Sequence, residues 1–175
     1  MRGFDGRASV HPVLTPTLQM PTKSPVRPPK PSQNPVRDAA DALYRAGCES
    51  CHQHQRLTKV LGHQLDDMEL EGVAEVVELC DQLLLKATTR YEELAKEGRG
   101  KESEDVWKAA NALWMAAREY CRRHAQSDAI ATRLKKHGAA QFNEISVEYE
   151  LEMSARLALK QALGAYSKHR PEASA

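Results

Sequence analysis

The stretch that decides the fold is GVAEVVELCDQLLLKATTRYEELAKEG, residues 72–98. Its apolar residues recur at spacings of four and three, the heptad alternation of a helix that packs against another helix. Such a helix gains most of its stability by burying its apolar stripe, so partner helices are expected. The stripe consists of Val73, Val77, Cys80, Leu84, Ala87, Tyr91 and Leu94.

The segment that follows predicts the first partner. GRGKES, residues 98–103, interrupts the helical pattern, and Ser103 has the character of an N-cap because acidic residues come directly after it. A second helix is predicted over residues 104–125. Its stripe has the same rhythm, and the short polar loop predicts an antiparallel hairpin. The stripe comprises Val106, Ala110, Leu113, Ala117, Tyr120 and His124.

The remaining body of the chain also predicts helices. Residues 36–170 contain no proline and few aromatic or β-branched residues, so a sheet is not expected. Further helices are predicted over 127–137 and 141–168, and residues 38–54 and 56–70 form two helices or one bent helix. Within 141–168, Glu148, Glu152, Arg156 and Lys160 lie four apart and predict a solvated face. The fold class is therefore all-α, an antiparallel bundle of about five helices over residues 37–170.

Both ends of the chain differ from this body in composition. Eight of the nine prolines lie between Pro12 and Pro35, and residues 1–37 carry a net charge of +5 against −4 for the rest. Residues 1–36 are predicted to be a disordered, basic, proline-rich arm, and residues 171–175 a disordered tail. PVRPPKP, residues 25–31, contains Pro-x-x-Pro spacings that aromatic-lined grooves accept.

Several classes of function are not expected. No apolar run is long enough to cross a membrane and no secretory signal is visible, so the protein is expected to be cytoplasmic. The chain has no phosphate-binding glycine loop, nucleophile elbow or His-Glu-x-x-His pattern, so an enzyme is not expected. Residues 118–137 are basic, but the acidic residues of 144–152 would repel phosphates, and nucleic acid is not expected. The acidic block 66–81 would complement the basic surface, within the fold or across a homodimer.

One segment carries a chemical signature. ADALYRAGCESCH, residues 40–52, resembles the N-terminal haem-binding helix of class I cytochromes c, including the position of Leu43 and Tyr44 before the first cysteine. The resemblance implies that Cys48 and Cys51 bind haem c through thioether bonds and that His52 is the proximal ligand. The sequence beyond this segment continues as a helix and departs from the family.

Zinc is a second interpretation of the same cysteines. Cys48 and Cys51 offer one pair of ligands, and Cys121 and His124 offer another, since residues three apart share a helix face. Zinc bound by all four would join two helices. The alternative is that the thiols are unliganded and packed, as expected for Cys80. Three further donors are not ranked by the sequence: His52, His54 and His63.

Together these patterns predict a non-enzymatic helical interaction or adaptor module. It binds a protein partner through the proline-rich arm or through a helical face, with no cofactor or with a structural zinc. The alternative function is electron transfer by covalently attached haem.

Overall fold

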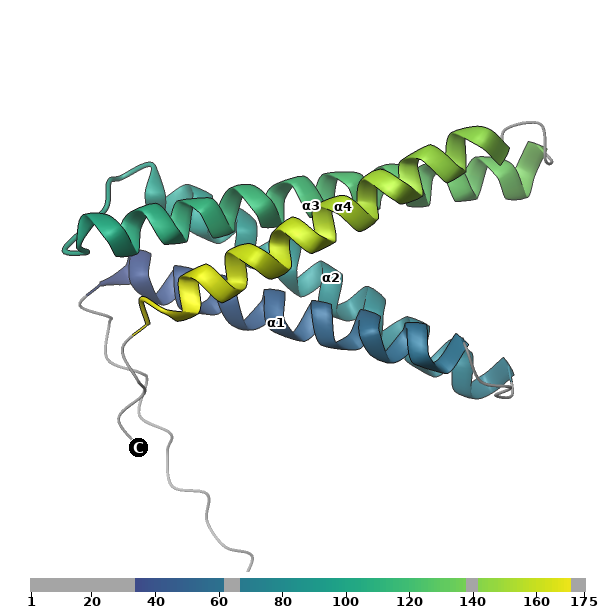
Figure 1. Ribbon diagram of the computed structural model, residues 1–175, viewed down its shortest axis with the longest axis horizontal. Helices are drawn as coiled ribbons and strands as arrows, with labels where there is room; N and C mark the ends of the chain where they lie inside the picture. The colour runs from purple at the N-terminus through teal and green to yellow at the C-terminus, as the bar shows by residue number, and fades with distance from the viewer. Residues whose placement is uncertain (1–33, 62–66, 138–141, 171–175) are drawn as a thin grey trace, which may run out of the picture. The chain divides into compact units, whose positions relative to one another are not determined.

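The computed structural model describes residues 34–61, 67–137 and 142–170, and this part of the chain is helical. It contains α1 (Pro35–Leu61), α2 (Asp67–Ala95), α3 (Glu104–His137) and α4 (Phe142–Ser167), with no strand among the described residues (Figure 1). None of these described helices is both long enough and apolar enough to cross a membrane. The predicted all-α class is confirmed.

The four helices form two antiparallel hairpins. α1 packs along α2, and α3 packs along α4 (Figure 1). The hairpins meet where α1 and α3 begin, and they diverge toward the tips of the hairpins (Figure 1). Burial follows this divergence, because in each helix the described side chains stop being buried between about half and three quarters of the way to the tip. The last buried side chains are His54, Val77, Tyr120 and Glu152.

The core fills the end where the hairpins meet. Its largest members are completely buried, and each contributes on the order of 1.5–3 kcal/mol by leaving water. The tyrosines place their hydroxyl groups at the edge of the core, where Tyr91 donates a hydrogen bond to Asn111 (3.0 Å) and Tyr166 to Asp41 (3.2 Å). The large core side chains are Leu43, Leu84, Tyr91, Leu113, Tyr120, Leu159 and Tyr166.

α1 begins at an N-cap just before the predicted domain boundary at residue 37. The Asn34 side chain accepts a hydrogen bond from the backbone N–H of Arg37 (3.2 Å), and Pro35 occupies the first helical position, where its missing N–H is not needed. Arg37 also pairs with Glu102 in the loop before α3 (3.1 Å). Of the predicted arm 1–36, only residues 34–36 belong to the described residues, and the predicted tail 171–175 lies outside them.

The structure has fewer helices than the sequence predicts. The predicted helices 104–125 and 127–137 are one continuous helix, α3, because Ala125 and Gln126 favour helix and no proline or glycine interrupts the chain. Ser127, read as a helix start, is an interior residue of α3. Residues 38–54 belong to a single helix that continues to Leu61. The described residues therefore contain four helices rather than five.

The predicted solvated face of α4 is wrong for most of its length. Glu152 is buried and Glu148 and Arg156 are largely buried, whereas Lys160 is exposed. The reason is that α3 supplies partners for these charges, since Arg123 pairs with Glu148 (3.2 Å) and His124 with Glu152 (3.0 Å). Spacing along one helix reports which residues share a face, but it does not report what that face meets.

Candidate functional site: a buried polar layer and the groove beside it

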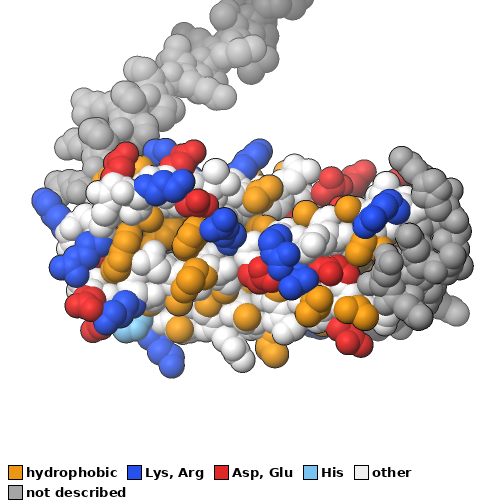
Figure 2. Space-filling view, turned by 90° about the horizontal axis from the view of Figure 1, so that it is seen from above, with side chains coloured by type: hydrophobic (Ala, Val, Ile, Leu, Met, Phe, Trp, Pro, Cys, Tyr) orange, Lys and Arg blue, Asp and Glu red, His pale blue; other side chains and the backbone are white. Residues whose placement is uncertain are grey.

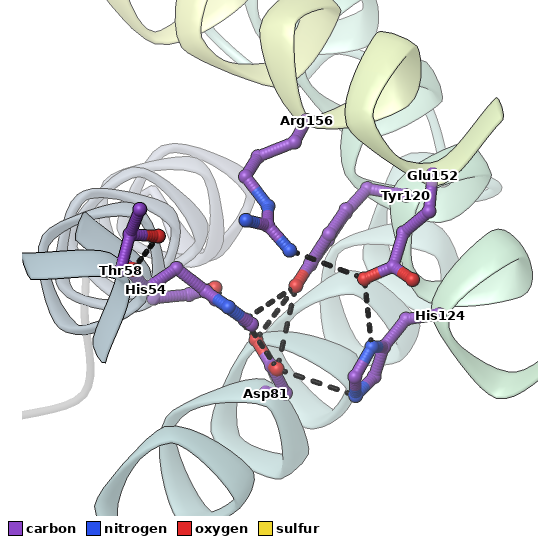
Figure 3. Close-up of polar contacts among 8 residues, drawn as sticks. His54, Thr58, Asp81, Tyr120, His124, Glu152 and Arg156 are labelled. Atoms are coloured by element: carbon purple, nitrogen blue, oxygen red, sulfur yellow. Dashed lines mark hydrogen bonds and ion pairs between the residues drawn. The ribbon is translucent and has the colours of Figure 1, made fainter. Parts of the chain in front are cut away.

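A layer of polar side chains closes the core at the point where the hairpins diverge (Figure 3). Its centre is the carboxylate of Asp81 on α2. Ser50 on α1 donates a hydrogen bond to one carboxylate oxygen (2.6 Å), and His54 Nε2 lies 2.7 Å from the other. The hydroxyl group of Tyr120 on α3 lies 3.3 Å from both oxygens. These four side chains are buried.

The contacts around His54 determine where its proton lies. Nε2 is 2.7 Å from Asp81 Oδ2 and also 2.7 Å from the hydroxyl oxygen of Tyr120. A nitrogen without a proton would face the carboxylate lone pairs, so Nε2 carries the proton and donates it toward Asp81. The hydroxyl oxygen of Tyr120 shares this N–H of His54 as a second acceptor, and the Tyr120 hydroxyl donates its own proton to Asp81. The donors of this half of the layer are thus directed at one carboxylate.

His124 links this centre to α4. Its Nε2 lies 3.4 Å from Asp81 Oδ2, and its Nδ1 lies 3.0 Å from Glu152 Oε1. Glu152 also accepts from Arg156 (3.2 Å), whose guanidinium lies over the ring of Tyr120 (Figure 3). The layer therefore connects all four helices through alternating acidic and basic groups.

The electrostatics of the layer favour its charged form. Burial alone would raise the pKa of Asp81, but hydrogen bonds from His54 and Ser50 outweigh burial and lower it. Glu152 behaves in the same way: burial alone would raise its pKa, but hydrogen bonding, with His124 as the main donor, and the charges of His124 and Arg156 together lower it. The hydrogen bond to Glu152 raises the pKa of His124 against the opposing effect of burial, and the charge of Asp81 adds to this.

These shifts predict how stability depends on pH. The raised pKa of His124 stabilises the fold below about pH 6.5, and this contribution is lost as pH rises through the folded-state pKa. The lowered pKa values of Asp81 and Glu152 stabilise the fold above about pH 4, and this contribution is lost as pH falls through their folded-state pKa values. The thermal midpoint, followed by circular dichroism, is expected to be highest between about pH 5 and pH 6.5.

The control for this prediction is His124→Gln. The variant is expected to be less stable at pH 6 and to lose most of the decline between pH 6 and pH 8.5, which should amount to roughly 1–3 °C in the parent protein. An unchanged alkaline decline in the variant would show that His124 does not titrate in this range.

A groove runs between α1 and α4 beside the polar layer. Two neighbouring hollows of about 370 and 270 Å³ form it, and they share Cys51, Gln55 and Lys160 as lining residues. On α1 the groove extends from Tyr44 to Lys59, which corresponds to about 22 Å of helix. Its lining includes apolar side chains and several basic ones, with no carboxylate among the lining residues that the structure describes.

The two pairs of residues predicted to bind zinc line different hollows. Cys48 and Cys51 line the groove between α1 and α4, while Cys121 and His124 line a hollow of about 170 Å³ between α2 and α3. Over 34–61, 67–137 and 142–170, no three His, Cys, Asp or Glu residues are arranged to hold a metal ion. Burial raises the pKa of Cys51, and it raises the pKa of Cys121 to about 11, which favours the protonated thiols. Zinc binding stays a prediction.

The residues predicted to bind haem share one hollow. Cys48, Cys51 and His52 all line the smaller part of the groove, and His52 is exposed. The α4 residues opposite them are Lys160, Leu163, Gly164 and Ser167, and none of these four is a common second axial ligand of haem iron. Covalent haem attachment also stays a prediction. His63, the remaining alternative donor, lies outside the described residues.

The polar layer is not among the features predicted from the sequence, although the spacing contains a signal for it. In α1 the buried positions alternate at four and three, and this alternation includes polar residues: Val36, Ala40, Leu43, Gly47, Ser50 and His54. In α2, Asp81 comes four residues after Val77 and three before Leu84, both buried. The sequence instead places Asp81 in an acidic block that complements the basic surface, and it offers His124 as a zinc donor.

The basic stretch 118–137 is also better understood in the structure. Arg122 and Arg123 both pair with Glu119 (2.6 and 2.9 Å), and their hydrogen bonds lower the pKa of Glu119 to about 2. α3 continues without a break through Ser127, so the basic residues before and after it belong to one helix.

Fold and site together define a four-helix bundle of two hairpins, with a buried polar layer and a basic, partly apolar groove. Comparison of the chain with models of protein families, with curated proteins and with solved structures gave no match.

Proposed function

We propose that this protein is a non-enzymatic interaction module whose groove between α1 and α4 binds an acidic amphipathic helix of a protein partner. The observation that carries the proposal is the groove itself, with exposed apolar side chains and basic groups on its walls. Met153 and Leu157 are 42% and 57% exposed there, so a partner that covers them gains hydrophobic free energy.

The dimensions of the groove favour a helix as its occupant. About 22 Å corresponds to about 15 residues, or four turns, of a helix lying along α1. Helices bind such grooves by inserting apolar residues spaced three and four apart. Apolar side chains also reach other parts of the surface, where they are interspersed with charged groups (Figure 2).

The charges of the groove favour an acidic partner. Lys59, Arg156 and Lys160 line its larger part, without a carboxylate among the described lining residues. Arg156 uses one guanidinium nitrogen for Glu152, while its buried Nε has no hydrogen-bond acceptor among the described residues. The Arg156 side chain is 19% exposed, so a glutamate or aspartate of the partner can pair with the accessible edge of its guanidinium.

The test uses a synthetic helical peptide of about 16 residues, with leucines at positions i, i+4, i+7 and i+11 and glutamates beside them. A matched peptide carries lysine in place of glutamate. Binding is measured by fluorescence anisotropy at low and high salt. The acidic peptide is expected to bind at least tenfold more tightly than the basic one, and its affinity is expected to fall at high salt, because salt screens the charges.

Variants of the protein locate the binding site. Lys160→Glu and Leu157→Ala are each expected to weaken binding of the acidic peptide, Lys160→Glu by roughly tenfold. Two controls lie outside the lining of the groove: Lys108→Glu on α3 makes the same charge change, and Leu151→Ala removes an exposed leucine of α4. Equal affinity for both peptides, or binding unaffected by Lys160→Glu, would refute the proposal.

A further inference from the structure

A second exposed apolar surface lies on α2, outside the groove. Val76, Leu79 and Leu83 are 39%, 56% and 48% exposed. Their spacings of three and four place them on one line of the helix. Leu85 is similarly exposed at 53%, but it lines the hollow between α2 and α3 and so belongs to another face. The line of Val76, Leu79 and Leu83 is called the α2 stripe below.

The charges beside the α2 stripe change sign along the helix. Glu71 and Glu75 accompany its N-terminal half, whereas Lys86 and Arg90 follow its C-terminal end, and all four are exposed. Neither Glu75 nor Lys86 forms an ion pair within the described residues of its own chain. A surface whose two halves carry opposite charge complements a copy of itself that runs in the opposite direction.

We propose that two copies of this chain associate through the α2 stripe, with their α2 helices antiparallel and crossing near residue 81. Leu79 and Leu83 are each two residues from that point, so Leu79 of one copy meets Leu83 of the other, twice by symmetry. Glu75 lies six residues before the crossing point and Lys86 lies five residues after it. Each Glu75 is therefore close to Lys86 of the second copy. A parallel arrangement would instead place Glu75 beside Glu75.

The small size of the α2 stripe sets the strength of this dimer. Three apolar side chains from each copy and the charges beside them form an interface below the usual size of a stable complex, which buries about 1,200–2,000 Å². A reversible dimer with a dissociation constant in the micromolar range is therefore expected. The surface is separate from the groove between α1 and α4, so this inference does not depend on the proposed function.

Sedimentation velocity of the full chain between about 2 and 200 μM tests the proposal. The protein is expected to shift from monomer toward dimer across this range. Glu75→Lys and Lys86→Glu each create two like-charge contacts in an antiparallel dimer, and each variant alone is expected to remain monomeric. Leu79→Glu is expected to do the same, whereas Leu85→Gln is expected to dimerise like the parent protein.

Mixing the two charge variants gives the decisive result. In a heterodimer of Glu75→Lys with Lys86→Glu, both contacts again join a lysine to a glutamate, so an equimolar mixture is expected to regain the dimer. The doubly substituted chain is expected to regain it as well. Circular dichroism of each variant confirms that it is folded. A parent protein that stays monomeric at 200 μM, or charge variants that dimerise alone, would overturn the proposal.

Discussion

Replacing Asp81 with alanine is expected to lower the free energy of unfolding by about 3–5 kcal/mol, because it removes the acceptor on which the polar layer converges. His54, Ser50 and Tyr120 would all lose a buried hydrogen-bond partner. Urea unfolding near pH 6, followed by circular dichroism, measures the loss. Glu71→Ala removes an exposed carboxylate from the same helix and is expected to change stability by less than about 0.5 kcal/mol.

A double-mutant cycle separates the role of the layer from simple loss of packing. If His54 and Asp81 act as a pair, the loss in the double alanine variant is expected to be smaller than the sum of the two single losses, by about 1–3 kcal/mol. Additive losses, or an Asp81→Ala variant as stable as Glu71→Ala, would contradict the assignment of this layer as a stabilising network.

The second large effect is expected in α4, where two leucines lie two residues apart. Leu159 is completely buried and Leu157 is 57% exposed. Leu159→Ala is expected to destabilise the bundle by about 2–5 kcal/mol, because it removes apolar contacts and leaves a cavity. Leu157→Ala is expected to change stability by less than about 0.5 kcal/mol.

This pair also distinguishes folding from binding. Leu157→Ala is expected to weaken binding of the acidic peptide without changing the midpoint of urea unfolding, because this side chain contributes to the groove and not to the core. Equal destabilisation by the two substitutions would mean that α4 does not present the face described above to α1 and α3.

The polar layer also has a role in specificity. Apolar heptads alone allow helices to slip by one turn at a modest free-energy difference. A slip of α2 against α1 would separate Asp81 from Ser50 and His54 and leave charged groups buried without partners. We infer that the layer fixes the register of the hairpins, as buried polar residues do in coiled coils.

Much of the fold follows from periodicity in the sequence. The predicted stripes of α2 and α3 are confirmed at Val77, Leu84, Leu113 and Tyr120, which are buried. The predicted N-cap at Ser103 is also present, since its hydroxyl accepts from the backbone N–H of Val106. These features could be predicted because they depend on residues within a few positions of one another.

The site could be predicted only in part. The sequence drew attention to His124 and to the cysteines, but it offered metal binding as the reason. The structure instead pairs His124 with Glu152 and Asp81, from two other helices, whereas spacing alone predicts a solvated position for Glu152. Local spacing shows that a charged residue shares a face with its neighbours, but not whether a partner of opposite charge lies across from that face.

By itself, the sequence determined that the body of this chain is helical and which residues of α2 and α3 point inward, because heptad spacing and helix propensity act within single helices. Only the tertiary structure decided that the hairpins diverge beyond Asp81. It also decided that α1 and α4 form a basic groove while the α2 stripe remains exposed. These features arise from contacts between residues up to about 130 positions apart, such as Asp41 and Arg170, and their geometry is set when the helices pack.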